Sequence, residues 1–398
     1  MRICFVSQED IVRPPGGTGT YVRNMSIALA GRRHDVHVIV RQRDGAPAQE
    51  VVDGVSVHRV SAPGPAVLYS PTYFRRSRRK FLELTAGAPF DVVQGNLPLM
   101  SSWGLRGPGL PPFVETVHCT VREELRALTR ASLRQLNFNE AVTRLLTPVL
   151  YHRERELLCR ARRVIAVSHG LKRELVDQIG YPADNVDVIP NGIDFARFAA
   201  VTRVDRLATR KALGIDPDER VILYLGRLME RKRVVDLVRA LPFVLQHTPQ
   251  ARLIVVGRRN SNAAHLEQVA RDLGVGSKVR LIDHVPYRHV PGYYRMADVY
   301  ALPSAYEGFP FTVLEAMASG VPVVASAIPG IDEQIVSGEN GLLHRVGDIG
   351  AIAQAIQRVL EHAGFAARLA AAGRCTVAQN YTWDVIAGRT EQVLQGMV

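Results

Sequence analysis

The sequence has few cysteines and no long apolar run, and each shortage excludes a class of protein. The four cysteines among 398 residues lie far apart and form no Cys-x-x-Cys pair, which argues against a disulfide framework or a zinc knuckle and favours a reducing cytoplasm. No apolar stretch approaches the roughly 18 residues that a membrane-spanning helix needs, and the best one, residues 321–328, has the length of a strand. The first seven residues turn polar too soon for a signal-peptide core. We therefore expect a cytoplasmic protein.

Lysine is also scarce. The formal net charge is +12, but only five of the fifty basic residues are lysines. A positive field would suit nucleic acid, an acidic membrane or a phosphorylated small molecule. So strong an arginine bias is typical of coding composition, which weakens charge as evidence of function. Because no nucleic-acid-binding motif accompanies the charge, we predict no nucleic-acid partner.

Short apolar runs alternate with helix-length amphipathic stretches almost from end to end. Many runs are rich in Val and Ile on both faces, as parallel strands covered by helices must be. This alternation predicts doubly wound parallel sheets, and two series of strands predict two of them. The first series is 3–7, 36–40, 91–94, 113–117, 164–168 and 186–189; the second is 221–226, 252–257, 279–282, 299–302 and 322–325; the expected helices include 19–31, 234–247, 262–273 and 311–319.

Pro, Asn and Gly at residues 190–192 punctuate the chain between the two series. We predict a Rossmann-like N-terminal domain over residues 1–195 and a second over 196–378. A last helix, within 379–398, opens at the aromatic segment 381–383. Because no strand of the second sheet follows this helix, we expect it to cross back to the first domain.

A glycine-rich loop, residues 14–20, lies between the first expected strand and the first helix. Glycines let backbone N–H groups approach a phosphate closely, and a helix N-terminus adds a favourable dipole. The loop is not a dinucleotide fingerprint, because Val22 replaces the third glycine, and it is not a Walker loop, because no Gly-Lys-Ser/Thr follows. Taken alone, the loop is equally well interpreted as a flexible turn.

The segment 307–315 is the most informative one. A turn rich in Gly and Pro leads directly into a helix expected to begin near Phe311, so Glu307 lies on the loop and Glu315 one turn into the helix. Two carboxylates placed in this way can reach opposite ends of one ligand while the helix N-terminus faces its phosphates. An isolated pair at this spacing is usually a capping acid and a surface glutamate. Here a helix, a glycine stop and a buried strand follow over 316–325, which favours the ligand interpretation.

Basic residues follow the first strand of the second series. Arg227 and Lys232 come at the carboxyl end of that strand, where doubly wound sheets bind ligands. Arginine offers a fork to paired phosphate oxygens and lysine a point charge. Read alone, a basic surface loop is the simpler explanation.

Two further motifs have simple explanations. His118 ends an expected strand, where a lone histidine is usually a packed or exposed residue, and the neighbouring Cys119 would point to the opposite face. Asp216 and Asp218 have a spacing that can hold a metal, but Asp and Pro are expected in the turn that they occupy. We predict a turn there and no metal site.

Taken together, these segments resemble the family-4 retaining glycosyltransferases of the GT-B fold, over most of the chain. The family implies two Rossmann-like domains facing across a cleft, with the donor nucleotide held mainly by the second and the acceptor by the first. The motifs that carry the resemblance occur in order: the Gly16-Gly17 loop, His118, Val167-Ser168, Ile189-Pro190-Asn191-Gly192-Ile193-Asp194, Gly226-Arg227 with Lys232, and the Glu307 to Glu315 pair.

The resemblance implies a role for each matching residue. Glu315 would accept hydrogen bonds from the ribose hydroxyls of the donor. Glu307, with Gly308 and Phe309, would contact the transferred sugar, and His118 would contact that sugar near the reacting carbon. His118 and Glu307 are therefore the candidate catalytic residues. The implied ligands of the donor diphosphate are Gly16, Gly17, Arg227, Lys232, Phe311 and Thr312.

The chemistry agrees with these roles. Breaking the bond to a nucleoside diphosphate builds negative charge on the leaving group, and fixed cations stabilise that charge where it develops. Basic side chains take the place of a metal, so we expect no metal and no cofactor besides the donor substrate. The family has no clear counterpart of the nucleophilic carboxylate of a retaining glycosidase. Same-face displacement assisted by the leaving phosphate is the usual proposal.

Two departures from the family pattern bear on the donor. Pro310 stands where many members have glycine, which removes one backbone donor and shifts phosphate binding onto Phe311, Thr312 or Gly308. The usual small acidic turn is replaced by Arg-Arg-Asn at 258–260. That loop lies towards the nucleobase in the family, so the preferred base stays open.

A basic segment in the first domain has two interpretations. Residues 73–84 combine five basic side chains with aromatic ones. Tyr73, Ser77, Phe81 and Leu84 fall on one helical face, so the segment could be an interfacial helix in peripheral contact with anionic lipid. Some family members do act on lipid-linked acceptors. We favour the other interpretation, a solvated basic helix that covers the first domain.

We therefore predict a retaining, metal-independent transferase that moves a hexose or N-acetylhexosamine from a nucleoside-diphosphate sugar to a hydroxyl acceptor. A UDP-sugar is favoured and GDP-mannose comes next; the acceptor is a small molecule or is lipid-linked. A sugar-nucleotide epimerase of the same fold and a catalytically silent nucleotide-sugar-binding protein stay as alternatives. The missing third glycine disfavours a nicotinamide dehydrogenase. The loops that would select the acceptor are residues 97–108 and 120–147, and the second of these is part of a long helical insertion. The sequence identifies neither the acceptor nor the oligomeric state.

Overall fold

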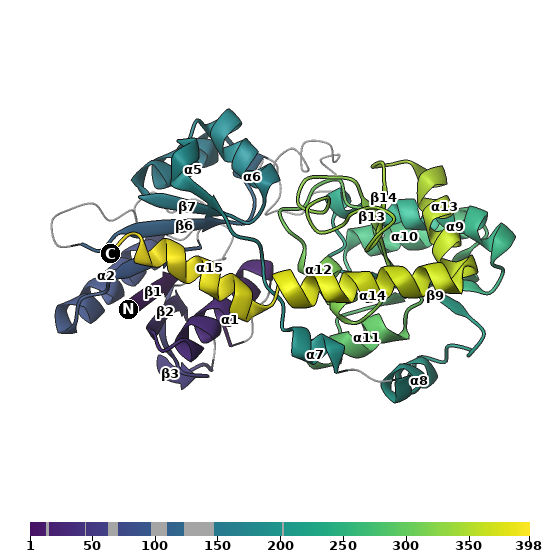
Figure 1. The fold of residues 1–398 in the computed structure, drawn as a ribbon, viewed down its shortest axis with the longest axis horizontal. Helices are drawn as coiled ribbons and strands as arrows, with labels where there is room; N and C mark the ends of the chain where they lie inside the picture. The colour runs from purple at the N-terminus through teal and green to yellow at the C-terminus, as the bar shows by residue number, and fades with distance from the viewer. Residues whose placement is uncertain (13–15, 44, 63–70, 97–109, 123–146, 201–202) are drawn as a thin grey trace. The chain divides into compact units, whose positions relative to one another are not determined.

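The computed structural model describes residues 1–12, 16–43, 45–62, 71–96, 110–122, 147–200 and 203–398 (Figure 1). The chain divides into two compact units. The first unit is Met1–Gly192 together with Trp383–Val398, and the second is Ile193–Thr382. The chain thus passes into the second unit once and returns once, whereas sequence reasoning places these crossings at 195 and 378.

The first unit is built on an eight-stranded sheet in the order β3-β4-β2-β1-β5-β6-β7-β8. All neighbouring strands pair in parallel except β3 and β4, which form an antiparallel hairpin at one edge. The strands are β1 (Arg2–Val6), β2 (Asp35–Arg41), β3 (Gln49–Val52), β4 (Val55–Val60), β5 (Val92–Gly95), β6 (Phe113–Val117), β7 (Arg163–Ala166) and β8 (Val186–Val188).

The β3–β4 hairpin is absent from the sequence-based prediction. Its two-residue turn is Asp53-Gly54, with φ of 50° and 83°. Positive φ at both central residues is the requirement of a type I′ turn, which matches the twist of the two strands that it joins. The Asp-Gly pair between two valine-rich runs was therefore a usable hairpin signal.

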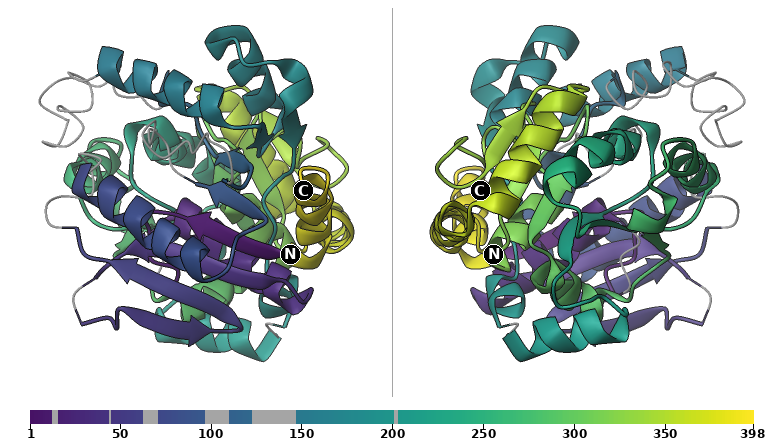
Figure 2. Two further views of the ribbon diagram at one scale, coloured as in Figure 1. Left: turned by 90° about the vertical axis from the view of Figure 1, so that its left-hand side faces the viewer. Right: turned by 90° about the vertical axis from the view of Figure 1, so that its right-hand side faces the viewer.

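The helices of the first unit cover the two faces of its sheet; α2 lies over the strands in the left view of Figure 2. Residues 123–146, most of the predicted helical insertion, and the loop 97–109 lie outside the described residues. The helices are α1 (Gly17–Gly31), α2 (Pro71–Gly87), α5 (Thr147–Arg160), α6 (His169–Glu174), continued by a π-helical turn at Leu175–Ile179, and α15 (Trp383–Gln395).

The apolar face of α2 packs on the sheet. Tyr73, Ser77 and Phe81 are each 0% exposed, and the Tyr73 hydroxyl donates to the carbonyl oxygen of Ser7 at 2.5 Å. Three of the four side chains that would enter a lipid layer are therefore buried within the unit, and the fourth, Leu84, is half-buried, which is the arrangement that the favoured interpretation predicts. Among the described helices of the chain, none is long and apolar enough to cross a membrane.

The second unit is built on a six-stranded parallel sheet in the order β11-β10-β9-β12-β13-β14. Its strands are β9 (Arg220–Leu225), β10 (Ala251–Val256), β11 (Val279–Ile282), β12 (Val299–Leu302), β13 (Val323–Ser326) and β14 (Leu342–His344), of which only the three-residue β14 is missing from the prediction. Its helices are α7 (Phe195–Ala199), α8 (Arg203–Ala212), α9 (Val234–His247), α10 (Ser261–Asp272), α11 (Val290–Met296), α12 (Phe311–Ala318), α13 (Ile349–Glu361) and α14 (Ala363–Asn380).

The two chain crossings lie next to each other. Ile193 N donates to the carbonyl oxygen of Tyr381 at 2.7 Å. A Cβ on Gly192 would lie 2.7 Å from ring atoms of Trp383, so only glycine fits beside that ring. The Trp383 ring also meets the ring of Tyr21 edge-on, with centroids 5.9 Å apart. These contacts lead α15 back to the first unit, where it runs beside α1 (Figure 1).

Candidate active site

The predicted donor residues come from two loops at one edge of the second sheet. One loop follows β9 and ends in the short 3-10 turn Glu230–Lys232 before α9; the other joins β12 to α12. Because β9 and β12 pair in parallel as neighbours, both loops leave the carboxyl edge of the sheet. Ala305 N donates to the carbonyl oxygen of Arg231 at 2.8 Å, and Arg231 Nη1 donates to that of Tyr306 at 2.9 Å. The two loops are therefore joined through their backbones.

A buried ion cluster lies between these loops. Lys232 Nζ donates to Glu307 Oε1 at 2.5 Å, and Ser304 Oγ donates to the same oxygen at 2.6 Å. Arg231 Nη1 lies 3.6 Å from Glu307 Oε2. Glu307 is only 7% exposed. The sequence predicted Lys232 and Glu307 as separate ligands of diphosphate and sugar, and the structure places them in direct contact.

Burial and charge act against each other in this cluster. Burial disfavours the Glu307 carboxylate, but the charges of Lys232 and Arg231 outweigh it and hold the Glu307 pKa below its usual value. Burial lowers the pKa of Lys232 to about 8, against the attraction of Glu307. Both groups are therefore charged at pH 7, and the lysine is close to losing its proton.

A tyrosine makes a hydrogen bond to the backbone of the Gly226-Arg227 segment. Tyr224 Oη donates to the carbonyl oxygen of Arg227 at 2.9 Å. Gly226 has a φ of 158°, and a Cβ there would lie 3.1 Å from Tyr224 Oη. The loop thus requires glycine at 226, and the Arg227 side chain is exposed.

The start of α12 has no side-chain cap. Its N-cap, Pro310, makes no capping hydrogen bond, so residue 310 satisfies none of the first amides of the helix, which include those of Phe311 and Thr312. Phe309 is 5% exposed, with its ring centroid 5.5 Å from that of Tyr381. Its side chain is therefore packed away from solvent.

Glu315 lies one turn into α12 and is 6% exposed. Tyr294 Oη donates to Glu315 Oε2 at 2.7 Å. Burial raises the pKa of Glu315 to about 7, although the hydrogen bond from Tyr294 and the charge of Arg197 oppose the rise. At pH 7 the Glu315 carboxyl group is therefore close to its pKa. Sequence reasoning missed Tyr294.

The described side chains that contact His118 in the first unit are uncharged. Its Nε2 lies 3.4 Å from Asn96 Oδ1, and its ring centroid is 4.7 Å from that of Tyr21. Gln94 Nε2 donates to Tyr21 Oη at 3.2 Å and to Thr116 Oγ1 at 2.7 Å. Burial lowers the pKa of His118 to about 4, so the imidazole is uncharged at pH 7. Asn96 could have been found in the sequence, because it also directly follows a strand.

The N-terminus of α1 carries a carboxylate that sequence reasoning missed. The helix begins at Gly17 with Gly16 as its N-cap. Glu9 Oε2 accepts a hydrogen bond from Gly19 N at 2.5 Å, and a Cβ on Gly16 would lie 2.9 Å from Glu9 Oε1. A phosphate at the predicted position would therefore meet a carboxylate already bound to the helix amides.

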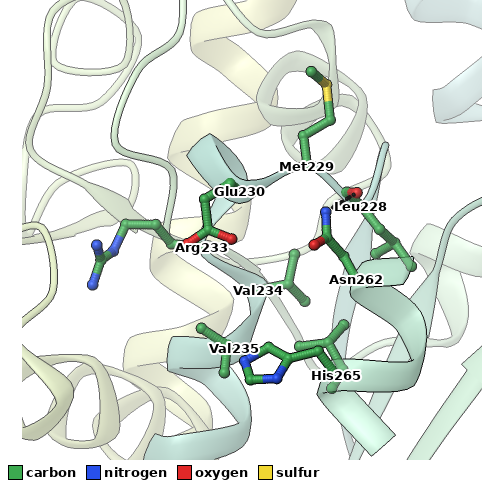
Figure 3. Close-up of a pocket in the computed structure, with 9 residues that line it drawn as sticks. Leu228, Met229, Glu230, Arg233, Val234, Val235, Asn262 and His265 are labelled. Atoms are coloured by element: carbon green, nitrogen blue, oxygen red, sulfur yellow. Dashed lines mark hydrogen bonds between the residues drawn. The ribbon is translucent and has the colours of Figure 1, made fainter. Parts of the chain in front are cut away.

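The Arg-Arg-Asn turn after β10 is anchored to the loop after β9. Asn260 accepts hydrogen bonds from the amides of Asn262 and Ala263, which makes it the N-cap of α10. Asn260 Nδ2 and Asn262 Nδ2 donate to the carbonyl oxygen of Leu228 at 2.7 and 2.8 Å. Figure 3 shows Asn262 and Leu228 beside a hollow of about 20 Å³, which has room for about one water molecule. The turn thus has a structural role beside any contact with a base.

Acidic groups elsewhere are arranged as ordinary turns. Asp218 N donates to Asp216 Oδ1 at 3.0 Å, which confirms the predicted turn. Within the described ranges, no three His, Cys, Asp or Glu side chains are arranged to hold a metal ion.

Comparison with known proteins gives the family of this chain. Residues 15–197 match the family described as Glycosyltransferase Family 4, and residues 205–376 match Glycosyl transferases group 1. The D-inositol 3-phosphate glycosyltransferase of Kribbella flavida is 30% identical over 397 residues, which cover 94% of this chain and 89% of that relative. The chain belongs to glycosyltransferase family 4.

Solved structures show the fold of this family-4 glycosyltransferase. Sucrose-phosphate synthase from Thermosynechococcus elongatus matches with a TM-score of 0.83 and 25% identity, covering 99% of this chain and 98% of that one. HepE of Anabaena, solved with UDP and glucose, matches with a TM-score of 0.77 and 22% identity over 100% of both chains. The predicted GT-B fold, with two parallel-sheet domains, is confirmed.

Proposed function

We propose that this family-4 glycosyltransferase moves a hexose or N-acetylhexosamine from a nucleoside-diphosphate sugar to a hydroxyl group, with retention of the anomeric configuration and without a metal ion. The observation that carries the proposal is the ion cluster of Lys232, Arg231 and Glu307, which lies just ahead of the N-terminus of α12.

The charges of this cluster fit a diphosphate leaving group. Arg231 and Lys232 supply two cations against the carboxylate of Glu307, and the exposed Arg227 lies in the same loop as these two cations. The surplus positive charge lies next to helix amides that can also bind phosphate oxygens. Fixed cations of this kind stabilise the charge that develops as the bond to the sugar breaks, which is the task that a metal performs in other enzymes.

Glu307 is suited to hold the transferred sugar. Its carboxylate is fixed by Lys232 and Ser304 and has a lowered pKa, so it stays ionised and accepts hydrogen bonds from sugar hydroxyls. His118, neutral at pH 7, can donate through one ring nitrogen and accept through the other. Neither group is set up to carry a charge change near pH 7. We therefore assign their contribution to positioning the sugar for same-face displacement.

The proposed donor is a UDP-sugar, with GDP-mannose as the next candidate, and the proposed acceptor is a small molecule or is lipid-linked. HepE, a structural neighbour, was solved with UDP and glucose. That ligand belongs to HepE, and at 22% identity it indicates which donor to try first.

The test is incubation of the purified protein with UDP-, GDP-, ADP- and dTDP-sugars, followed by proton NMR of the released sugar. We expect slow hydrolysis of one donor with its anomeric configuration retained. Release of the inverted anomer would contradict the retaining mechanism. An epimerised donor in the same spectra would show that the protein is an epimerase and not a transferase. A protein that binds donors without changing any of them would be a silent binding protein.

A further inference from the structure

A buried tyrosine holds the carboxylate that we assign to the ribose. Tyr294 lies on α11 and is 0% exposed. Its ring meets the rings of Phe198 and Tyr300 edge-on, with centroids 6.0 and 5.4 Å away. Packing on both sides fixes the ring, so the hydroxyl reaches one place, Glu315 Oε2 at 2.7 Å.

The contact is selective between the two oxygens of Glu315. A tyrosine hydroxyl has one proton to donate, and here it goes to Oε2. Oε1 is left to accept from a ligand. An ionised carboxylate accepts hydrogen bonds from two adjacent hydroxyls, whereas a protonated one loses part of that capacity. The geometry and the charge of Glu315 therefore both depend on its partner.

We propose that Tyr294 is a positioning residue for the donor: its hydroxyl fixes Glu315 in the orientation, and in the ionised form, that accepts hydrogen bonds from the ribose. This inference rests on the proposed function, because it takes Glu315 as the ribose ligand. Tyr294 itself touches no substrate.

The other charged and titratable neighbours do not replace this hydrogen bond. On α7, Arg197 lowers the pKa of Glu315 through its charge, but its guanidinium stacks on the Tyr287 ring at 4.3 Å and donates to the Tyr287 carbonyl oxygen at 3.2 Å. On β12, the Tyr300 hydroxyl donates to the carbonyl oxygen of Leu225 at 3.4 Å. Among the described groups around Glu315, Tyr294 is thus the one that donates to its carboxylate.

The test compares Tyr294→Phe with Tyr300→Phe. Both variants lose one hydroxyl from a buried ring of the same aromatic group, and only the first loses the bond to Glu315. UDP, GDP and ADP are titrated calorimetrically against each protein at pH 7. We expect Tyr294→Phe to bind the preferred nucleotide about ten-fold more weakly, the size typical of one hydrogen bond to a charged group, and Tyr300→Phe to bind it as the wild type does. In turnover, Tyr294→Phe should raise the KM for the donor far more than it lowers kcat.

A double variant and a titration separate positioning from structural damage. In a Glu315→Gln background, Tyr294→Phe should cause little further loss of affinity, because the two changes remove the same arrangement. Carbon-13 NMR of labelled glutamate carboxyls, with Glu315→Gln identifying the signal, should show a higher Glu315 pKa in Tyr294→Phe. The hydrogen bond favours the ionised form, so its loss raises the pKa.

The outcomes distinguish the two proposals. If the wild type binds a nucleotide and Tyr294→Phe binds it equally well, the positioning role is wrong and the proposed function stands. If the wild type binds none of the three nucleotides, both are wrong. Equal loss of affinity in Tyr300→Phe would assign the effect to packing and overturn the positioning role.

Discussion

The carboxyl edges of the two sheets carry different chemistry on similar scaffolds. In the second unit, the residues after β9 and β12 form an ion cluster, with Glu307 bonded to Lys232 and beside Arg231. In the first unit, the residue after β6, His118, has neutral neighbours, Asn96 and Tyr21. Burial affects both edges but has different results: it brings Lys232 to a pKa of about 8 and Glu315 to about 7, and it moves His118 to about 4.

This difference separates two tasks. Groups that titrate near pH 7 respond to a charged ligand, and they are found in the second unit, where we propose the nucleoside diphosphate. A group that stays neutral over the working pH range can contact an uncharged hydroxyl compound without a charge penalty, and it is found in the first unit. The comparison thus contrasts the ion cluster after β9 and β12 with the neutral hydrogen bonding of His118 after β6.

We expect the largest loss of activity when the ion cluster of the second unit is removed. Lys232→Ala and Glu307→Ala should each reduce transfer about 100-fold or more, because each removes a fixed group that acts on developing charge or on the sugar. Steady-state kinetics with the preferred donor measure the loss.

A matched control for this prediction is Lys278→Ala, which removes one of the other lysines of the second unit. Lys278 Nζ donates to the carbonyl oxygen of Pro249, away from the loops after β9 and β12. This variant should keep nearly full activity. Circular dichroism must show all three variants folded; near wild-type turnover in both cluster variants would sink the site assignment.

The pH dependence of activity tests the contrast between the titrating groups of the second unit and the neutral His118. Below about pH 7 Glu315 takes up a proton, and above about pH 8 Lys232 loses one. The donor kcat/KM should therefore be highest between about pH 7 and 8 and fall up to about ten-fold per pH unit on either side. Glu315→Gln should abolish the acid limb and keep the basic one. His118, with a pKa of about 4, should contribute no limb in this range, and an acid limb that survives in Glu315→Gln would contradict the assignment.

A smaller effect is expected from the one carboxylate at the start of α1. Glu9→Gln keeps an acceptor for Gly19 N and removes the charge. If the donor diphosphate approaches the Gly16-Gly17 amides, the KM for the donor should fall about two- to five-fold, the size of a charge effect at a helix N-terminus. An unchanged KM would place the diphosphate away from this helix and restrict phosphate binding to the second unit.

The smallest expected effect is that of a chelator. We predict that excess EDTA leaves turnover unchanged, because Arg227, Arg231 and Lys232 are proposed to neutralise the leaving group. Activity is measured before and after dialysis against EDTA. Loss of activity that Mg²⁺ or Mn²⁺ restores would show that the cations of the second unit are not sufficient.

The sequence predicted those helices and strands that have a clear pattern of apolar residues. Two strands that are buried on both faces, β6 and β12, were predicted at their observed bounds, and β12 is a continuous apolar run. The edge hairpin β3–β4 was missed although Asp53-Gly54 marks its turn, because β3 has only four residues and none of them is buried. The three residues of β14 are too few for any period.

The site was predictable residue by residue but not contact by contact. Motif spacing indicated Lys232 and Glu307 on loops that follow strands, and Glu315 one turn into a helix. It could not show that Lys232 and Glu307 form a pair, because their loops are 75 residues apart and meet only through the β9–β12 pairing. Tyr294 and Glu9 were missed for the same reason. Each acts through a contact that no motif spacing predicts, with a residue 21 positions along the chain for Tyr294 and 10 for Glu9.

The return of α15 to the first unit has a consequence for the order of folding during synthesis. Ile386, Ala387 and Leu394 of this helix are 0% exposed, so the first unit completes its core only with residues made after the whole of Ile193–Thr382. The usual N-terminal-first order of domains on the ribosome is thereby reversed. The second unit is continuous in sequence and can complete its core first, while the first unit waits for α15 to cover its contact surface on α1.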